Sequence, residues 1–184
     1  ATLTESNNAS ANLLLSEIQA GNPYSGALHV TDFLQSVGLR STFLAAPYDL
    51  KDNVAPPNFV TPANARTDIS TNPDPYLQTT PMEMAMLLEG VYQCANGGGF
   101  LRLLYPQEIT PAECQDVLGW MKQNQVNSLL GAGMPEGVES AHKHGWAGDT
   151  HADVALVYTD EEDFVLSVYL YAPEWLTWEE SAAT

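Results

Sequence analysis

Basic residues are scarce in this chain of 184 residues: six Lys and Arg stand against 23 Asp and Glu, which gives a formal net charge of −17. Nucleic acids and anionic membrane surfaces are bound through clustered Lys and Arg, so the charge balance argues against both partners. The simplest explanation of the acidic excess is a solvated surface that favours solubility, in keeping with a salty or extracellular setting.

Long apolar runs are also missing. No stretch approaches the roughly 20 residues that a membrane span needs, so we expect no membrane-spanning helix. The first residues, ATLTESNNASANLLL, lack the basic n-region of a signal peptide. A mature or trimmed chain would lack it as well, so this absence excludes no compartment.

Cysteine is limited to two residues, Cys94 and Cys114. Each lies near an end of two consecutive helical segments that can pack antiparallel. A disulfide that closes a loop of this size contributes about 3 kcal/mol, mainly by restricting the unfolded chain. We therefore consider a Cys94–Cys114 bridge in an oxidising compartment, with two free buried thiols as the alternative.

The clearest β pattern lies between Gly137 and Tyr171 and predicts three strands with two tight connections. Residues 154–159 alternate in the manner of a strand, and the almost continuous apolar run 164–171 predicts a strand buried on both faces. Gly148-Asp149 and the acidic run 160–163 are typical turn sequences.

The residues before these strands predict mainly helices, over 6–20, over 26–37, from Thr79-Thr80-Pro81 and from Thr110-Pro111, with a short helical turn at 126–130. Seven of the twelve prolines lie between Pro47 and Pro81, so we expect a long loop over 45–79. A last helix is expected to begin near Pro173. The order indicates an α+β fold in one module, with a mainly helical region over residues 1–135 and antiparallel strands with a terminal helix over 136–184.

Two short motifs carry the functional signal. Ser6-Asn7-Asn8 is a Ser-x-Asn at the head of a helix, where Ser6 or Asn7 also suits an N-cap. Lys143-His144-Gly145 is a Lys-x-Gly on a predicted strand of a strongly acidic protein. Together with the Thr-Thr-Pro helix between them, they resemble the second and third motifs of the serine β-lactamase and penicillin-binding-protein superfamily. The class A β-lactamase-like branch is the most similar, and the resemblance runs over nearly the whole chain.

The resemblance implies acyl transfer without a cofactor: a serine attacks a β-lactam or peptide carbonyl and forms a covalent acyl-enzyme. Ser6 and Lys143 would be catalytic, with Ser6 passing a proton toward the leaving nitrogen and Lys143 supplying positive charge to the substrate carboxylate. Asn8, His144 and Gly145 would bind substrate, Asn8 through the side-chain amide. His144 stands where the family has a Thr or Ser, so carboxylate binding by its imidazolium should strengthen below about pH 6.5.

The chain departs from the family pattern in two chemical respects. The nucleophile motif Ser-x-x-Lys should precede Ser6 by dozens of residues, and the string at Ser140–Lys143 is a coincidence because it overlaps the third motif on a strand. The deacylating Glu of class A enzymes has no equivalent, since no Glu occurs from Ile18 to Met82; Asp49 and Asp52 are the candidate substitutes. We therefore expect the C-terminal portion of a longer extracytoplasmic protein, with the early strands and the nucleophile helix in sequence outside this chain. This chain alone is then expected to be inactive, with that missing N-terminal portion of the fold as a partner.

Two other functions remain open. A β-lactamase-like fold can serve as a non-catalytic binding or scaffold domain at the cell surface, which the absent Glu and His144 both favour. Alternatively, a hairpin with three imidazoles and a carboxylate can bind Zn²⁺, although the main hypothesis requires no metal. The ligands of such a zinc site would be His142, His144, His151 and Asp153.

Overall fold

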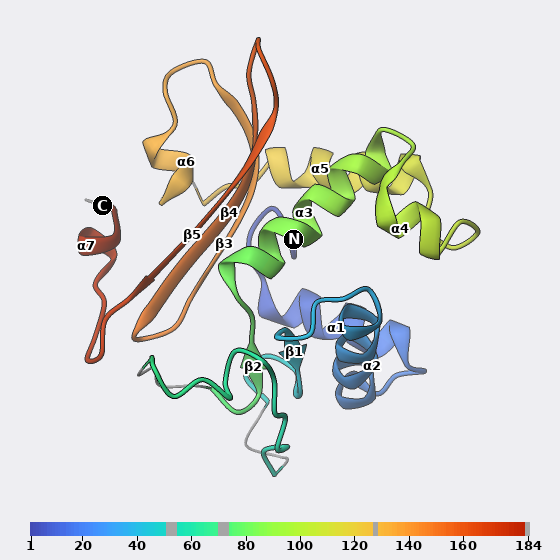
Figure 1. The fold of residues 1–184 in the computed structure, drawn as a ribbon, viewed down its shortest axis with the longest axis vertical. Helices are drawn as coiled ribbons and strands as arrows, with labels where there is room; N and C mark the ends of the chain where they lie inside the picture. Colours follow the sequence, from blue (N-terminus) through green and yellow to red (C-terminus); the bar gives the residue numbers. More distant parts are fainter. Residues whose placement is uncertain (51–54, 70–73, 127–128, 183–184) are drawn as a thin grey trace. The chain divides into compact units, whose positions relative to one another are not determined.

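The computed structural model describes residues 1–50, 55–69, 74–126 and 129–182. The chain forms two compact units: the first comprises residues 1–2 and 7–83, and the second residues 3–6 and 84–184. Figure 1 shows the elements of both. The mainly helical region over residues 1–135 falls in both units, because most of the helices that follow residue 83 belong to the same unit as the sheet.

The first unit begins with two helices, α1 (Asn8–Ile18) and α2 (Pro23–Ser36). Asn7 caps α1, as expected, by accepting a hydrogen bond from the backbone N–H of Ser10. The helices approach closely at Gly26, where an added Cβ would lie 1.9 Å from the carbonyl oxygen of Leu15. Only a glycine allows this approach, which brings α2 against the one buried leucine of α1.

Most of the large apolar side chains of α1 are exposed. Leu13, Leu14 and Ile18 are 61%, 55% and 46% exposed, whereas Leu15 is buried with Ala27 and Leu44. Successive residues of a helix point about 100° apart, so the run of three leucines has no periodicity that marks Leu15 as the residue that contacts α2.

The Pro-rich segment contains a strand that the sequence did not reveal. Strand β2 (Leu77–Gln78) pairs antiparallel with β1 (Phe43–Leu44). The carboxylate of Glu83 accepts hydrogen bonds from Ser41 N at 2.8 Å and from Thr42 Oγ1 at 2.6 Å, which fixes the approach to β1. Two-residue strands carry no periodicity, so this small sheet depends on contacts between distant residues.

The second unit is built on the antiparallel sheet β3-β4-β5, formed by β3 (Glu139–Trp146), β4 (Thr150–Tyr158) and β5 (Phe164–Tyr171). All three strands and both turns are confirmed. However, the central strand β4 is the buried one, and β5 is half-buried because it lies at an edge.

The described residues of this unit also form the helices α3 (Pro81–Ala95), which starts in the first unit, α4 (Gly99–Leu104), α5 (Pro111–Lys122), α6 (Leu130–Gly133) and α7 (Trp178–Ala182). Figure 1 shows α6 and α7 on the side of the sheet away from α5. The Thr-Pro starts of α3 and α5 are confirmed, and α5 has a Thr110–Glu113 capping box. The sequence missed α4, and α7 begins later than predicted because Thr177 and Glu180 cap it.

The core of this unit joins α3 and α5 to one face of the sheet. Its buried residues are Leu88, Leu118, Met121, Ala141, Val154 and Leu156. Cys94 of α3 and Cys114 of α5 form a disulfide, which confirms the predicted pair. Both sulfur-bearing residues are buried, so the bridge fastens the two helices that support the sheet.

We expect replacement of both Cys94 and Cys114 by serine to lower the free energy of unfolding by about 3 kcal/mol, because the bridge closes a loop of sequence separation 20. Urea denaturation measures the change. The unmodified protein under reducing conditions is the control and should lose a similar amount. Equal stability of the oxidised and reduced protein would contradict this assignment of the bridge's role.

Candidate active site

The central feature of the candidate site is a contact between Lys143 and Ser6. Lys143 lies on β3 opposite Val154, a core residue of β4, so its side chain emerges on the core face of the sheet. Its Nζ donates to Ser6 Oγ at 2.6 Å and to the carbonyl oxygen of His144 at 2.6 Å. The structure thus brings together the two residues predicted to be catalytic, which are far apart in sequence.

Ser6 is held by the residues before it. Leu3 packs against the sheet core, and the carbonyl oxygen of Thr4 accepts a hydrogen bond from Gln125 N at 2.7 Å. Ser6 itself has a φ of 56°, in the left-handed region that non-glycine residues rarely occupy. Such a conformation persists only where the surroundings enforce it, and functional sites are enriched in it.

The pair is suited to proton transfer. Burial lowers the pKa of Lys143 below its ordinary value, because desolvation disfavours the charged ammonium. An ammonium group in contact with a hydroxyl can deliver a proton through that hydroxyl to a third atom. The described residues place no carboxylate within ion-pair distance of Lys143, so its charge is available to an anion.

Asn8 belongs to the first unit and has a different environment. Its Nδ2 donates to Asp49 Oδ2 at 2.8 Å, and both side chains are exposed. Asp49 is one of the two carboxylates considered as substitutes for the absent Glu. The other, Asp52, lies outside the described residues.

His144 lies on the opposite face of β3 from Lys143, because neighbouring residues of a strand alternate between its two faces. Its side chain is only 3% exposed, and its ring stacks on Trp146 with the ring centroids 5.3 Å apart. Burial, followed by the charge of Lys143, lowers the pKa of His144 to about 4. The ring is therefore neutral between pH 5 and 8, so an imidazolium that binds the substrate carboxylate does not fit this position.

Gly145, the last residue of the motif, is exposed on β3. A Cβ added there would meet no heavy atom within 4 Å among the described residues. No neighbour within the described chain therefore requires glycine, and the strand surface beside Lys143 is open.

The structure does not support the zinc hypothesis. The Nδ1 atom of His142 lies 3.2 Å from Asp153 Oδ2, whereas His151 Nδ1 contacts Ser181 Oγ. The ring of His144 stacks on a tryptophan instead of converging with them. Within residues 1–50, 55–69, 74–126 and 129–182, no group of three or more His, Cys, Asp or Glu is placed to hold a metal ion.

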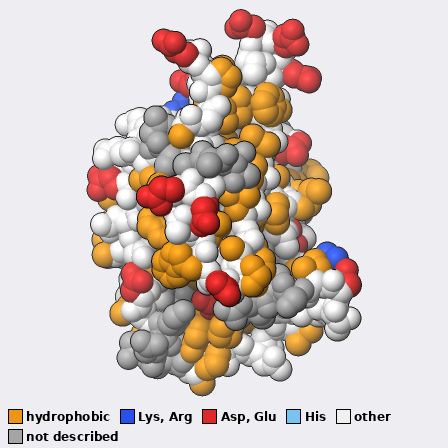
Figure 2. Space-filling model, turned by 90° about the vertical axis from the view of Figure 1, so that its left-hand side faces the viewer, with side chains coloured by type: hydrophobic (Ala, Val, Ile, Leu, Met, Phe, Trp, Pro, Cys, Tyr) orange, Lys and Arg blue, Asp and Glu red, His pale blue; other side chains and the backbone are white. Residues whose placement is uncertain are grey.

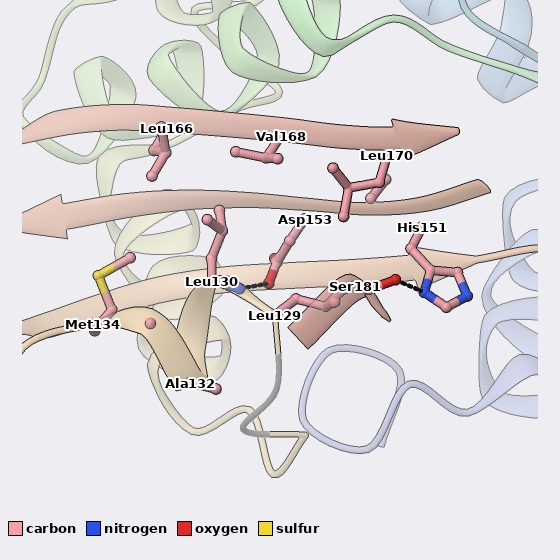
Figure 3. Close-up of a pocket in the computed structure, with 12 residues that line it drawn as sticks. Leu129, Leu130, Ala132, Met134, His151, Asp153, Leu166, Val168, Leu170 and Ser181 are labelled. Atoms are coloured by element: carbon pink, nitrogen blue, oxygen red, sulfur yellow. Dashed lines mark hydrogen bonds between the residues drawn. The ribbon is translucent and has the colours of Figure 1, made fainter. Parts of the chain in front are cut away.

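A cavity of about 300 Å³ lies on this second face of the sheet, and sequence reasoning missed it. Figure 3 shows its apolar wall of Leu166, Val168 and Leu170, with His151 hydrogen-bonded to Ser181 at one end. Ser181 also donates to the carbonyl oxygen of Thr177, the residue before α7, so the contact between Ser181 and His151 fastens α7 to β4. Figure 2 views this side, where hydrophobic side chains form much of the surface.

Comparison with known proteins identifies the family. The sequence profile of the beta-lactamase enzyme family matches residues 1–184. The chain belongs to this family. A membrane-spanning helix was not found among the described residues.

Solved class A β-lactamases and a penicillin-binding protein share the fold. An ancestral class A β-lactamase of Gram-negative bacteria is 27% identical, with a TM-score of 0.67 over 100% of this chain and 58% of its own. A β-lactamase from Xanthomonas campestris is 24% identical, with a TM-score of 0.68 over 100% of this chain and 57% of its own. PBP-A is 18% identical, with a TM-score of 0.67 over 98% and 53%.

This member of the beta-lactamase family therefore spans a little over half the length of the solved structures that it matches. A comparison with curated protein sequences found no match. The α+β, β-lactamase-like fold predicted from the sequence is confirmed.

The buried neutral His144 makes the stability of this family member pH-dependent. Its pKa is about 4 in the folded protein and about 6.5 in the unfolded chain, so only the unfolded chain takes up a proton between these values. The free energy of unfolding should fall by up to about 3 kcal/mol as the pH decreases from 6.5 to 4.

The variant His144→Phe retains an aromatic ring against Trp146 and removes the titration. Urea denaturation at pH 4.5, 5.5, 6.5 and 7.5 should show a weaker pH dependence for this variant than for the unmodified protein. His151 contributes to both proteins, so the difference reports His144 alone. Parallel stability curves would show that His144 is not buried in its neutral form.

Proposed function

We propose that these residues belong to a serine hydrolase that transfers acyl groups from β-lactam or peptide-type substrates through a covalent acyl-enzyme. The contact of 2.6 Å between Lys143 Nζ and Ser6 Oγ is the observation that carries this proposal. It joins the second and third family motifs into one proton-transfer pair. The nucleophile is supplied by sequence outside this chain, so this chain alone is inactive.

In the proposed reaction, the nucleophilic serine gives its hydroxyl proton to a base that, like the serine, is supplied by sequence outside this chain. The serine oxygen bonds to the carbonyl carbon of the substrate, and the C–N bond breaks. The leaving nitrogen takes the proton of the Ser6 hydroxyl, and Ser6 regains a proton from Lys143. The lowered pKa of Lys143 supports this role, because a less basic ammonium gives up its proton more readily. Lys143 also attracts the carboxylate of the substrate before the bond breaks.

Substrate binding is assigned to the remaining motif residues. Asn8 hydrogen-bonds the side-chain amide of the substrate, and Gly145 leaves the strand surface beside Lys143 open. His144 contributes through its main-chain carbonyl, which accepts a hydrogen bond from Lys143. Since β3 is an edge strand among the described residues, an extended peptide or a β-lactam can lie along it.

The similar structures support this substrate class. A PBP-A mutant has been solved as an acyl-enzyme complex with penicillin G. We infer that this chain acts on β-lactams, with a role in antibiotic resistance, or on peptidoglycan-like peptides. An extracytoplasmic location is supported by the Cys94–Cys114 disulfide, which requires an oxidising compartment.

A second candidate is a non-catalytic binding or scaffold domain at the cell surface. It is favoured by the absence of Glu from Ile18 to Met82, since a class A enzyme needs a carboxylate to hydrolyse the acyl-enzyme. Under either function, the missing N-terminal portion of the fold is the proposed partner. Covalent labelling by a penicillin distinguishes the two candidates.

We expect a fluorescent penicillin to label the whole protein, and Lys143→Ala or Ser6→Ala to slow labelling about 100-fold, the usual loss for a proton-transfer group. The matched control is Lys122→Gln, which removes an equal charge from an exposed ion pair with Glu139. Labelling rates read from gel fluorescence measure the effect. No label between pH 5 and 8 would overturn the hydrolase proposal and favour the scaffold domain.

A further inference from the structure

Asp49 has an unusual backbone conformation for an exposed residue. Its φ is 61°, in the left-handed region, which glycine adopts without strain and other residues adopt less often. Its carboxylate accepts a hydrogen bond from Asn8, the residue assigned above to the substrate amide. A strained residue in contact with a binding residue calls for a functional explanation.

Hydrogen bonds on both sides hold this conformation in place. Asn12 binds the preceding residue twice: its Nδ2 donates to Tyr48 O at 2.8 Å, and its Oδ1 accepts from Tyr48 N at 2.8 Å. On the other side, the hydroxyl of Tyr24 donates to Leu50 O at 3.2 Å. Asn8 and Asn12 share one face of α1, so a single helix face fixes both the backbone and the carboxylate of this turn.

The carboxylate determines how the amide of Asn8 is oriented. An ionised carboxylate only accepts hydrogen bonds, so Asn8 must direct Nδ2 toward Asp49. This leaves its Oδ1 and its second N–H for another group. An amide of a substrate, which offers one donor and one acceptor, complements these two atoms.

We propose that Asp49 is a positioning and specificity-determining residue, which orients Asn8 and selects substrates whose acyl side chain carries an ammonium group over those with a carboxylate. This inference rests on the proposed function. Asp49 Oδ1 is exposed and has no hydrogen-bond partner among the described residues, so it can accept from an ammonium next to the amide held by Asn8. A carboxylate at the same place is repelled.

The experiment uses the whole protein and three penicillins with the same nucleus and a phenyl side chain. Their side chains carry an α-ammonium group, an α-carboxylate or no charge. We expect the ammonium compound to acylate about fivefold faster than the carboxylate compound, as is typical of an exposed charge interaction. Second-order rate constants from competition with the fluorescent penicillin give this preference.

Two variants separate charge from position. Asp49→Asn retains an oxygen that accepts from Asn8, so it should lose the charge preference and slow acylation by the neutral penicillin less than Asp49→Ala does. Asp49→Ala should lose the preference and also slow acylation by all three penicillins, because Asn8 is no longer oriented. The matched control is Glu17→Gln, which removes an exposed charge about 14 Å along α1 from Asn8.

Each outcome decides the inference. A preference that Asp49→Asn abolishes and Glu17→Gln retains supports it. Equal rates for the three penicillins, a preference that Asp49→Asn retains, or equal effects of the Asn and Ala variants would overturn it while the proposed acyl transfer stands. No acylation by any penicillin would overturn the proposed function and this inference with it.

Discussion

The pairing of β3 with β4 is the constraint on which the second unit depends. Lys143 lies opposite Val154, and His144 lies opposite Asp153. Because side chains alternate along a strand, this register sends Lys143 to the face with Ser6 and buries His144 on the other. A shift by one residue would exchange them, moving the ammonium into the aromatic cluster and the imidazole toward Ser6. The buried residues on both sides of β4 make that shift costly.

Elements with a local sequence pattern could be predicted, whereas features that depend on tertiary contacts could not. The strands, their turns and the Thr-Pro helix starts were predicted correctly because each has a strong local pattern. The Lys143–Ser6 pair was anticipated from its motifs, although no local pattern brings the two residues together. The role of His144 at the substrate carboxylate was inferred from its place in the motif, whereas the burial of its ring against Trp146 depends on tertiary contacts that the motif does not encode. The burial of Leu15, the short strands β1 and β2 and the cavity depend on tertiary contacts that leave no periodicity in the sequence.

The electrostatics of Lys143 and His144 differ although the residues are adjacent. Both are desolvated, and burial lowers the pKa of each. The histidine loses its charge and joins an aromatic cluster with Trp146 and Trp178, although neither of its ring nitrogens has a hydrogen-bond partner among the described residues. Lysine has a much higher ordinary pKa, and its ammonium is compensated by two oxygen acceptors rather than by a carboxylate. In a chain with a net charge of −17, Lys143 has no ion-pair partner among the described residues, although the charge of Asp153 acts on it from farther away, and this preserves its attraction for an external anion.

A partly buried cation and a left-handed serine both reduce stability, so the surrounding structure must offset them. The disulfide joins α3 and α5, and both helices pack on the face of the sheet from which Lys143 emerges. Leu3 and Thr4 attach the segment before Ser6 to the same unit. Ser6 is therefore tied to the second unit by the residues before it and by its hydrogen bond with Lys143. A proton relay gains from this arrangement, because its rate depends on keeping the two groups within hydrogen-bond distance while the substrate enters.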